Sequence, residues 1–167
     1  MADFHQNGVI STLHNFSHRT VDDIENELRT FSKDAPIELI LPSLYSELER
    51  PALKNIVECL SKVKYLNHIT IGLDKANKSQ FKNAKKFFSN LNQSHSVIWN
   101  DSPRMKKLDK NLQSLGLAPD EPGKGKNVWY CMGYTFARGE AKSIALHDCD
   151  ITTYNRELLA RLVYPVA

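Results

Sequence analysis

Short apolar runs alternate along this chain with segments whose apolar residues recur at helical spacing. The apolar runs cover residues 37–41, 68–73, 97–99 and 143–146. The helical pattern covers about 20–35, 48–63, 78–91, 103–115, 128–138 and 156–163. Strands that alternate with amphipathic helices are typical of a parallel sheet with right-handed crossovers. The sequence therefore predicts an α/β fold of three layers, Rossmann-like, with a mainly parallel sheet and helices on both faces.

Size and composition indicate a globular protein. With 167 residues, 41% hydrophobic and 25% charged, the chain is long enough for a substantial core. No apolar run approaches the ~20 residues that span a membrane, and the N-terminus lacks the pattern of a signal peptide. The three cysteines, Cys59, Cys131 and Cys149, are unevenly spaced. They are therefore expected to be reduced thiols, and a cytoplasmic location is expected.

The net charge of +3 is too small to indicate a nucleic-acid partner. The lysines of residues 78–86 recur at helical spacing, which predicts a solvated helix face. Because no pattern of stacking aromatic residues accompanies them, we expect no nucleic-acid binding here.

Two carboxylates end the fourth apolar run, where residues 144–151 read Ile-Ala-Leu-His-Asp-Cys-Asp-Ile. Asp148 and Asp150 would lie at the carboxyl end of a strand, the edge at which open α/β sheets bind ligands. Carboxylate oxygens suit a hard divalent cation, and such a cation suits a diphosphate. The run therefore predicts a site for Mg²⁺ or Mn²⁺.

A glycine- and lysine-rich stretch, Pro122 to Lys126, lies about twenty residues upstream. Two prolines and two glycines in residues 117–125 predict a loop that leads into the next helix. Glycine lets backbone amides approach a phosphate, the helix start adds positive potential, and Lys124 supplies a full charge. The stretch is not a P-loop, because Gly-x-x-x-x-Gly-Lys-Ser/Thr is absent. Beside a bound metal it would form a diphosphate-binding arrangement.

Four segments together resemble a known family. They read Leu-Pro-Ser-Leu-Tyr-Ser-Glu at 41–47, Asp at 74, Pro-Gly-Lys-Gly-Lys-Asn-Val-Trp at 122–129 and His-Asp-Cys-Asp-Ile at 147–151. This set resembles the nucleotide-binding half of a GT-A fold glycosyltransferase, in particular the glucosyl-3-phosphoglycerate and mannosylglycerate-type synthases of glycosyltransferase family 2. The resemblance covers about residues 37–165. It implies metal-dependent transfer of a hexosyl group from a UDP- or GDP-hexose to a small anionic acceptor such as 3-phosphoglycerate or glycerate.

The resemblance also implies roles for individual residues. Those expected to bind the nucleotide are Pro42, Leu44, Glu47, Asp74, Gly123, Lys124 and Asp148. The first three would line the base and ribose pocket, Asp74 would contact the base edge, and Lys124 would lie near the phosphates. Asp150, together with Asp148, would bind Mg²⁺ or Mn²⁺ against the diphosphate. By their residue types, Trp129 and His147 are expected to be packed in the interior.

The resemblance divides the chain into an N-terminal extension with a helix, residues 1–35, and a nucleotide-sugar-binding half domain, residues 36–167. The sheet is expected to be incomplete at the C-terminus, which would favour a homodimer, and activity of the chain alone stays open. One alternative is a non-catalytic nucleotide-binding or interaction module. Another is a phosphatase of the haloacid-dehalogenase type, because residues 148–152 match Asp-x-Asp-x-Thr, with Asp148 as nucleophile and Asp150 as acid/base.

Overall fold

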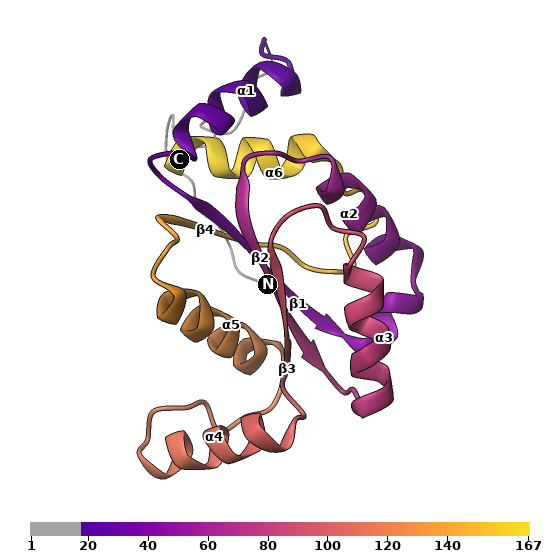
Figure 1. Ribbon diagram of the computed structural model, residues 1–167, viewed down its shortest axis with the longest axis vertical. Helices are drawn as coiled ribbons and strands as arrows, with labels where there is room; N and C mark the ends of the chain where they lie inside the picture. Colours follow the sequence, from indigo (N-terminus) through magenta and orange to yellow (C-terminus); the bar gives the residue numbers. More distant parts are fainter. Residues whose placement is uncertain (1–17) are drawn as a thin grey trace, which may run out of the picture.

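The computed structural model describes residues 18–167, and its four strands form one parallel sheet (Figure 1). The strands are β1 (Ile37–Leu44), β2 (Leu66–Asp74), β3 (His95–Trp99) and β4 (Ser143–Leu146), in the order β3-β2-β1-β4. The helices are α1 (Val21–Phe31), α2 (Pro51–Ser61), α3 (Lys78–Phe88), α4 (Pro103–Ser114), α5 (Lys124–Arg138) and α6 (Arg156–Val163). Two short 3₁₀-helices, η2 (Tyr45–Glu49) and η3 (Tyr164–Val166), complete the described part. The predicted α/β fold is confirmed.

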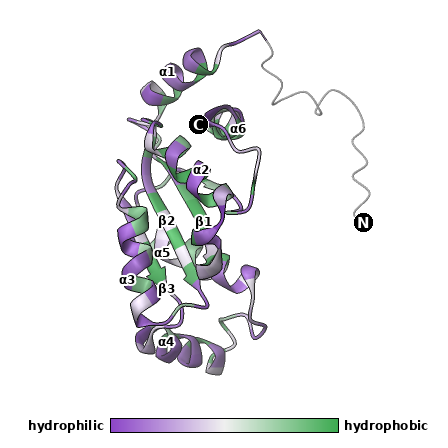
Figure 2. Cartoon of the chain, turned by 90° about the vertical axis from the view of Figure 1, so that its right-hand side faces the viewer, coloured by the Kyte–Doolittle hydropathy of each residue, from purple (hydrophilic) through white to green (hydrophobic). Residues whose placement is uncertain are grey.

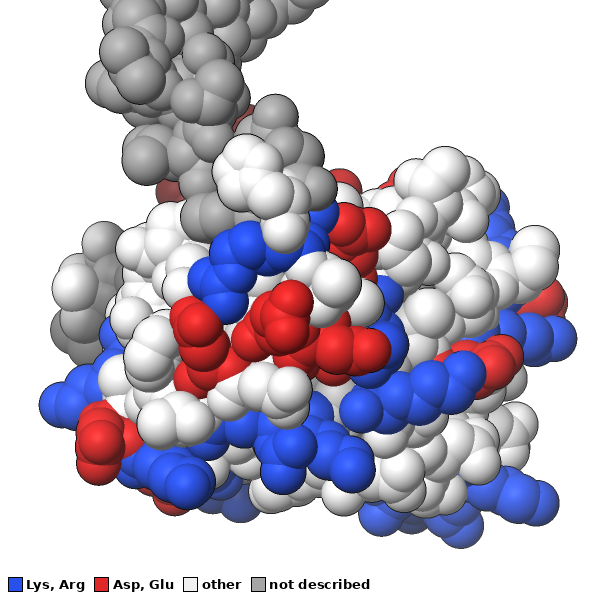
Figure 3. Space-filling model, turned by 90° about the horizontal axis from the view of Figure 1, so that it is seen from above, with Lys and Arg blue, Asp and Glu red and all other residues white. Residues whose placement is uncertain are grey.

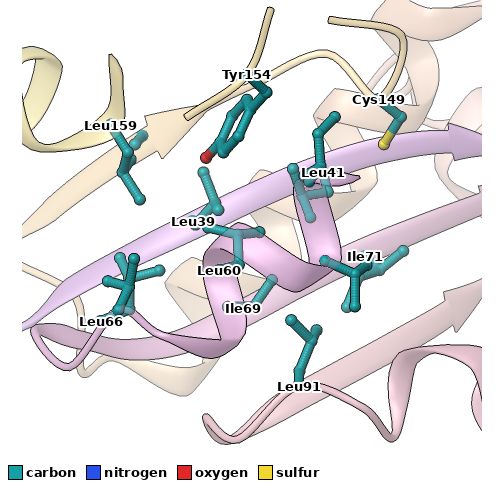
Figure 4. Close-up of a cluster of buried hydrophobic side chains, with 14 of the residues drawn as sticks. Leu39, Leu41, Leu60, Leu66, Ile69, Ile71, Leu91, Cys149, Tyr154 and Leu159 are labelled. Atoms are coloured by element: carbon teal, nitrogen blue, oxygen red, sulfur yellow. The ribbon is translucent and has the colours of Figure 1, made fainter. Parts of the chain in front are cut away.

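One face of the sheet carries the main hydrophobic core. Alternate residues of the two central strands, among them Leu39, Leu41, Ile69 and Ile71, are fully buried there. Figure 4 shows them gathered with Leu60 of α2 and with side chains from the C-terminal segment. Because side chains of a strand alternate between faces, these residues pack together beneath helices α2, α3 and α6.

The opposite face is covered by α5 and is more polar. Thr135 of α5 lies 3.5 Å from Thr70 of β2, oxygen to oxygen, and the Asn127 amide donates to the Gly72 carbonyl at 3.0 Å. At the far end of this face Arg138 donates to the fully buried Glu38 at 3.4 Å. Figure 1 shows α5 across the sheet from α2 and α3, so the three predicted layers are present.

Helix α1, in the second half of the predicted N-terminal extension, packs against α6. Its residues Ile24 and Leu28 are fully buried in the same core as the sheet. Arg156 of α6 donates to Glu25 of α1 at 2.7 Å. Seen from the α1 end, acidic and basic side chains lie side by side (Figure 3). Residues 1–17 of that extension lie outside the described residues.

Three predicted boundaries shift for local reasons. Strand β1 continues to Leu44 through Pro42, whose missing N–H faces the side on which β4 has already ended. Helix α2 begins only at Pro51, which suits a first helical position because its nitrogen needs no acceptor there. Helix α5 begins at Lys124 rather than near residue 128, so the predicted loop ends at Gly123.

Helix α4 lies at the periphery, and none of its residues is buried. Figure 2 shows it mainly hydrophilic, whereas the central strands are hydrophobic. Trp129, predicted to be packed, is 38% exposed on α5, because Asn127, Tyr130 and Cys131 occupy the face toward the sheet. No helix within residues 18–167 is both long and apolar enough to cross a bilayer.

Candidate functional site

A cavity of about 560 Å³ opens at the carboxyl ends of the strands. All eight residues predicted from the sequence line it: Pro42, Leu44, Glu47, Asp74, Gly123, Lys124, Asp148 and Asp150. The volume lies in the range of small-molecule sites. Strand order reverses between β1 and β4, and ligands of open α/β sheets bind outside such a reversal. The predicted residues are therefore brought together at the expected edge.

The Asp-Cys-Asp turn after β4 is anchored from its middle. Cys149 is 2% exposed and packs into the hydrophobic core (Figure 4), while Asp148 is half-buried and Asp150 exposed. Just before the turn, the His147 N–H donates to the Ile40 carbonyl at 3.1 Å, which extends the strand pairing by one bond. The buried cysteine thus holds the two flanking carboxylates at the mouth of the cavity.

His147 is buried, as predicted. Its Nδ1 lies 3.0 Å from the hydroxyl oxygen of Tyr154, which is itself buried beside the core. Burial lowers the pKa of the imidazole from 6.5 to about 4, against the opposing charge of Asp148. The ring is therefore neutral at physiological pH and supports the turn by packing and one hydrogen bond.

Lys124 and Asp148 form an ion pair across the cavity. Gly123 immediately precedes α5, and its φ of 139° lies in a region that L side chains rarely adopt. Lys124 is consequently the first residue of the helix, at the positive end of its dipole. The two side chains are 56% and 46% exposed, so both remain accessible to a ligand. The predicted metal ligand Asp148 is thus paired with the predicted phosphate-contacting lysine.

Glu47 closes the turn after β1. Its carboxylate accepts from the Leu44 N–H at 3.0 Å and from the Ser43 hydroxyl at 3.1 Å. The bond from the Leu44 N–H satisfies one backbone donor at the start of η2, as the glutamate of a capping box does. Glu47 therefore lines the cavity while it fixes the loop that follows Pro42.

Asp74 ends β2, directly beside Leu44 of β1. Its carboxylate accepts from the Asn100 amide at 2.7 Å. Burial raises the pKa of Asp74 above its usual range, while hydrogen bonds from Asn100 and Asn127 work in the opposite direction. The result is a partly buried carboxylate that is held in position by neutral amides.

The cavity also contains residues that the sequence reasoning missed, from the end of β3, helix α4 and helix α5. They include Asn100, Asp101, Asp109, Lys126 and Tyr130. Asp109 of α4 accepts from Lys126 at 2.8 Å and from Tyr130 at 2.5 Å. Burial alone would raise the pKa of Asp109, but these two hydrogen bonds lower it below its usual range. The four-residue spacing of Lys126 and Tyr130 could have indicated their shared role, because it places both side chains on one helix face.

The residues of the turn suit a divalent cation that a ligand helps to bind. Within residues 18–167, no three His, Cys, Asp or Glu side chains converge in a way that could hold a metal. Mg²⁺ is usually bound through one or two carboxylates together with substrate phosphates. Asp150, which is exposed at the cavity, and Asp148 provide that donor set. The fit therefore requires a phosphate-bearing ligand.

No family model matches the chain, but two curated proteins are similar to it. The chain is 49% identical over 166 residues to a glucosyl-3-phosphoglycerate synthase of Persephonella marina, covering 99% of this chain and 41% of the relative. It is 34% identical over 165 residues to a glucosyl-3-phosphoglycerate synthase of Methanococcoides burtonii, covering 98% and 40%. The chain thus spans about two fifths of the length of these curated relatives. The resemblance predicted from the loops is confirmed, since over almost all its residues this chain is similar to glucosyl-3-phosphoglycerate synthases.

Proposed function

We propose that this chain is the donor-binding part of a metal-dependent glycosyltransferase. The enzyme would transfer a hexosyl group from a nucleotide diphosphate sugar to a small anionic acceptor such as 3-phosphoglycerate or glycerate. The observation that carries the proposal is the convergence of Asp148, Asp150 and Lys124 on one cavity at the strand-order reversal. The names of the two relatives support the class of reaction.

The phosphate end of the donor would lie at the start of α5. The first N–H groups of a helix have no intrahelical acceptors and point toward the ligand. Lys124 adds a full positive charge at this end, and Gly123 leaves space because it has no side chain. As the bond to the sugar breaks, negative charge grows on the departing diphosphate. Lys124 and the helix start would stabilise that charge more than they stabilise the ground state.

Asp150, with Asp148, would hold Mg²⁺ or Mn²⁺ against the same diphosphate. The cation would act as a Lewis acid that neutralises the leaving group. Asp148 forms an ion pair with Lys124, so its carboxylate would contact both the lysine ammonium group and the divalent cation. Asp150 forms no ion pair within residues 18–167 and is exposed, which leaves it available to the metal.

The remaining parts of the proposal concern the setting of the enzyme. Cys59, Cys131 and Cys149 are free thiols, which supports a cytoplasmic location. A homodimer stays a prediction. The chain spans about two fifths of the length of its relatives. The proposal therefore names the chemical class of the acceptor and assigns no individual residue to positioning it.

Isothermal titration tests the donor site directly. UDP and GDP are titrated into the protein with and without Mg²⁺ or Mn²⁺, and then into Asp150→Ala. Asp120→Ala serves as the matched control, because Asp120 is an exposed aspartate outside the cavity lining. We expect metal-dependent binding of a nucleoside diphosphate that weakens at least roughly tenfold in D150A and is unchanged in D120A.

Three outcomes would contradict the proposal. Absence of nucleotide binding under every condition would exclude this chain as a donor site. Binding without release of the nucleotide when the hexose donor and 3-phosphoglycerate are both supplied would favour the non-catalytic module. Hydrolysis of simple phosphate esters, with the enzyme trapped in an inactive complex by beryllofluoride, would instead favour the phosphatase.

A further inference from the structure

We propose that helix α4 is a hinged lid on the donor cavity, and that Asp109 is the positioning residue that latches it to α5. The inference rests on the proposed function, because the lid would control how the nucleotide enters and leaves the same cavity. Figure 1 shows α4 at one end of the molecule, beyond β3 and beside α5.

Helix α4 and the residues directly around it form a unit that holds its own shape. At its start, the Ser102 hydroxyl accepts from the Met105 N–H at 3.1 Å. At its end, Gly116 has a φ of 67°, the left-handed conformation that commonly follows a helix. The Gln113 amide then donates to the Pro119 carbonyl at 3.4 Å. Because these bonds lie within the unit, α4 can move as one body without losing its structure.

The unit is only lightly attached to the rest of the protein. None of residues 103–114 is buried. Within residues 18–167, every side-chain hydrogen bond that joins α4 to another helix ends on Asp109, which accepts from Lys126 at 2.8 Å and from Tyr130 at 2.5 Å. Segments with few buried contacts open at a lower free-energy cost than the core does. The carboxylate of Asp109 is therefore the main polar attachment of α4 to α5.

One face of α4 forms a wall of the cavity. Met105, Lys106 and Asp109 line the cavity, and this spacing places them on one side of the helix. Leu108 lies on another side and is exposed to solvent. Latched to α5, α4 therefore bounds the cavity. An outward swing of α4 would remove that wall and open a path for the nucleotide.

The segments on both sides of α4 can absorb such a swing. Residues 100–102 form a turn after β3, and residues 117–123 contain neither helix nor strand. Gly116 and Gly123, which bracket the second segment, both have positive φ values, 67° and 139°. Hinges are a few residues in loops or at the ends of elements that take up large backbone changes. The two connections therefore provide a hinge on each side of the lid.

A bound diphosphate would favour the closed lid through Lys106. A ligand shifts a conformational equilibrium only if it binds one state more tightly than the other. Lys106 lies on the cavity face of α4 and forms no ion pair within residues 18–167. Its ammonium group would be attracted to the diphosphate only while α4 is closed. The nucleotide would thus draw the lid in, and Asp109 would hold it there.

Stopped-flow fluorescence tests the latch, with the fluorescent analogues mant-UDP and mant-GDP as probes in the presence of Mn²⁺. In Asp109→Asn we expect the dissociation rate constant to rise roughly tenfold, the order expected for one hydrogen bond to a charged group. The association rate constant should rise as well, because the free protein is also latched. The affinity should therefore fall by less than dissociation accelerates. A residue that merely stabilises the site would leave association unchanged.

Two variants accompany this measurement. Tyr130→Phe keeps the ring and removes only the hydroxyl that donates to Asp109, so it should accelerate both rate constants several-fold. It also tests the latch independently of whether D109N folds. Lys110→Gln is the matched control, because Lys110 is exposed on the same helix, outside the cavity lining, and loses one charge. K110Q should exchange nucleotide at the wild-type rate.

Amide hydrogen exchange shows whether α4 itself moves. Bound nucleotide should slow the exchange of residues 103–114 in the wild-type protein, and this slowing should be smaller in D109N. Nucleotide rate constants that stay at wild-type values in both D109N and Y130F would overturn the lid and leave the donor site intact. Exchange of α4 that does not respond to bound nucleotide would do the same. Absence of binding for every nucleotide would overturn the proposed function, and the lid with it.

Discussion

Gly72 is the point at which helix α5 lies directly on β2, and Gly72→Ala should separate them. A Cβ added at this position would lie 1.7 Å from the Asn127 side-chain oxygen and 2.5 Å from the Cys131 sulfur. Asn127 cannot simply turn away, because it is 3% exposed and its amide donates to the Gly72 carbonyl at 3.0 Å. The substitution therefore acts on a packed and hydrogen-bonded contact.

The magnitude follows from two effects. Overpacking of a well-packed interior costs about 1–3 kcal/mol, and a buried amide that loses its partner costs about 1–3 kcal/mol more. We expect the free energy of unfolding of G72A to fall by about 2–6 kcal/mol. The melting temperature would fall by roughly 2–4 °C for each kcal/mol in a domain of this size. Because Lys124 begins α5, nucleotide binding should weaken as well.

Urea unfolding followed by far-UV circular dichroism measures the effect. Gly133→Ala is the matched control, because Gly133 lies in the same helix, exposed, with no atom within 4 Å of the added Cβ. It should stabilise the protein by about 0.5–1 kcal/mol through helix propensity. In an Asn127→Ser background the cost of G72A should shrink but not vanish, since the nearest obstructing atom, the Asn127 side-chain oxygen, is gone while the Cys131 sulfur remains. A G72A variant as stable as the wild type would refute the close packing of α5 on β2.

Three further predictions concern other contacts. Burial lowers the pKa of His68 from 6.5 to about 4, so the unfolded chain binds the proton more readily than the folded protein does. The contribution of His68 to the free energy of unfolding is therefore complete above pH 6.5 and is lost as the pH falls toward 4. Urea unfolding over a series of pH values should show a weaker dependence of stability on pH in His68→Gln. Arg138→Ala leaves the fully buried Glu38 without its cation and should cost roughly 3 kcal/mol in the same assay, whereas an unchanged stability would show that the pair contributes nothing. Asp109→Asn weakens the contacts from α4 to α5, and residues 103–114 include no buried side chain that would hold α4 in place. The amide hydrogen exchange of α4 should therefore accelerate in this variant while that of β1 stays slow. An equal change of exchange rate in both elements would contradict this prediction.

Much of the fold could be read from local pattern. The four strands and six helices were predicted because apolar spacing reflects which face of each element is buried, and this information lies within a few consecutive residues. The errors lie at ends where a single backbone property decides. Gly123 starts α5 early, and Pro51 starts α2 late. Trp129 was predicted to be packed from its residue type, but the register of α5 turns it outward.

The chemistry of the turn and the loop was likewise legible in the sequence, because Asp148, Asp150 and Lys124 are marked by residue type and by short-range neighbours. Their convergence could be expected from the rule that parallel strands end at one edge. The ion pair of Lys124 with Asp148 joins residues twenty-four positions apart, and the contact of Asn100 with Asp74 joins two strands. Neither is visible to a local pattern. The sequence by itself determined the elements and the types of ligand group, whereas only the crossovers and strand order decided which distant side chains meet, since such contacts depend on how the whole chain packs.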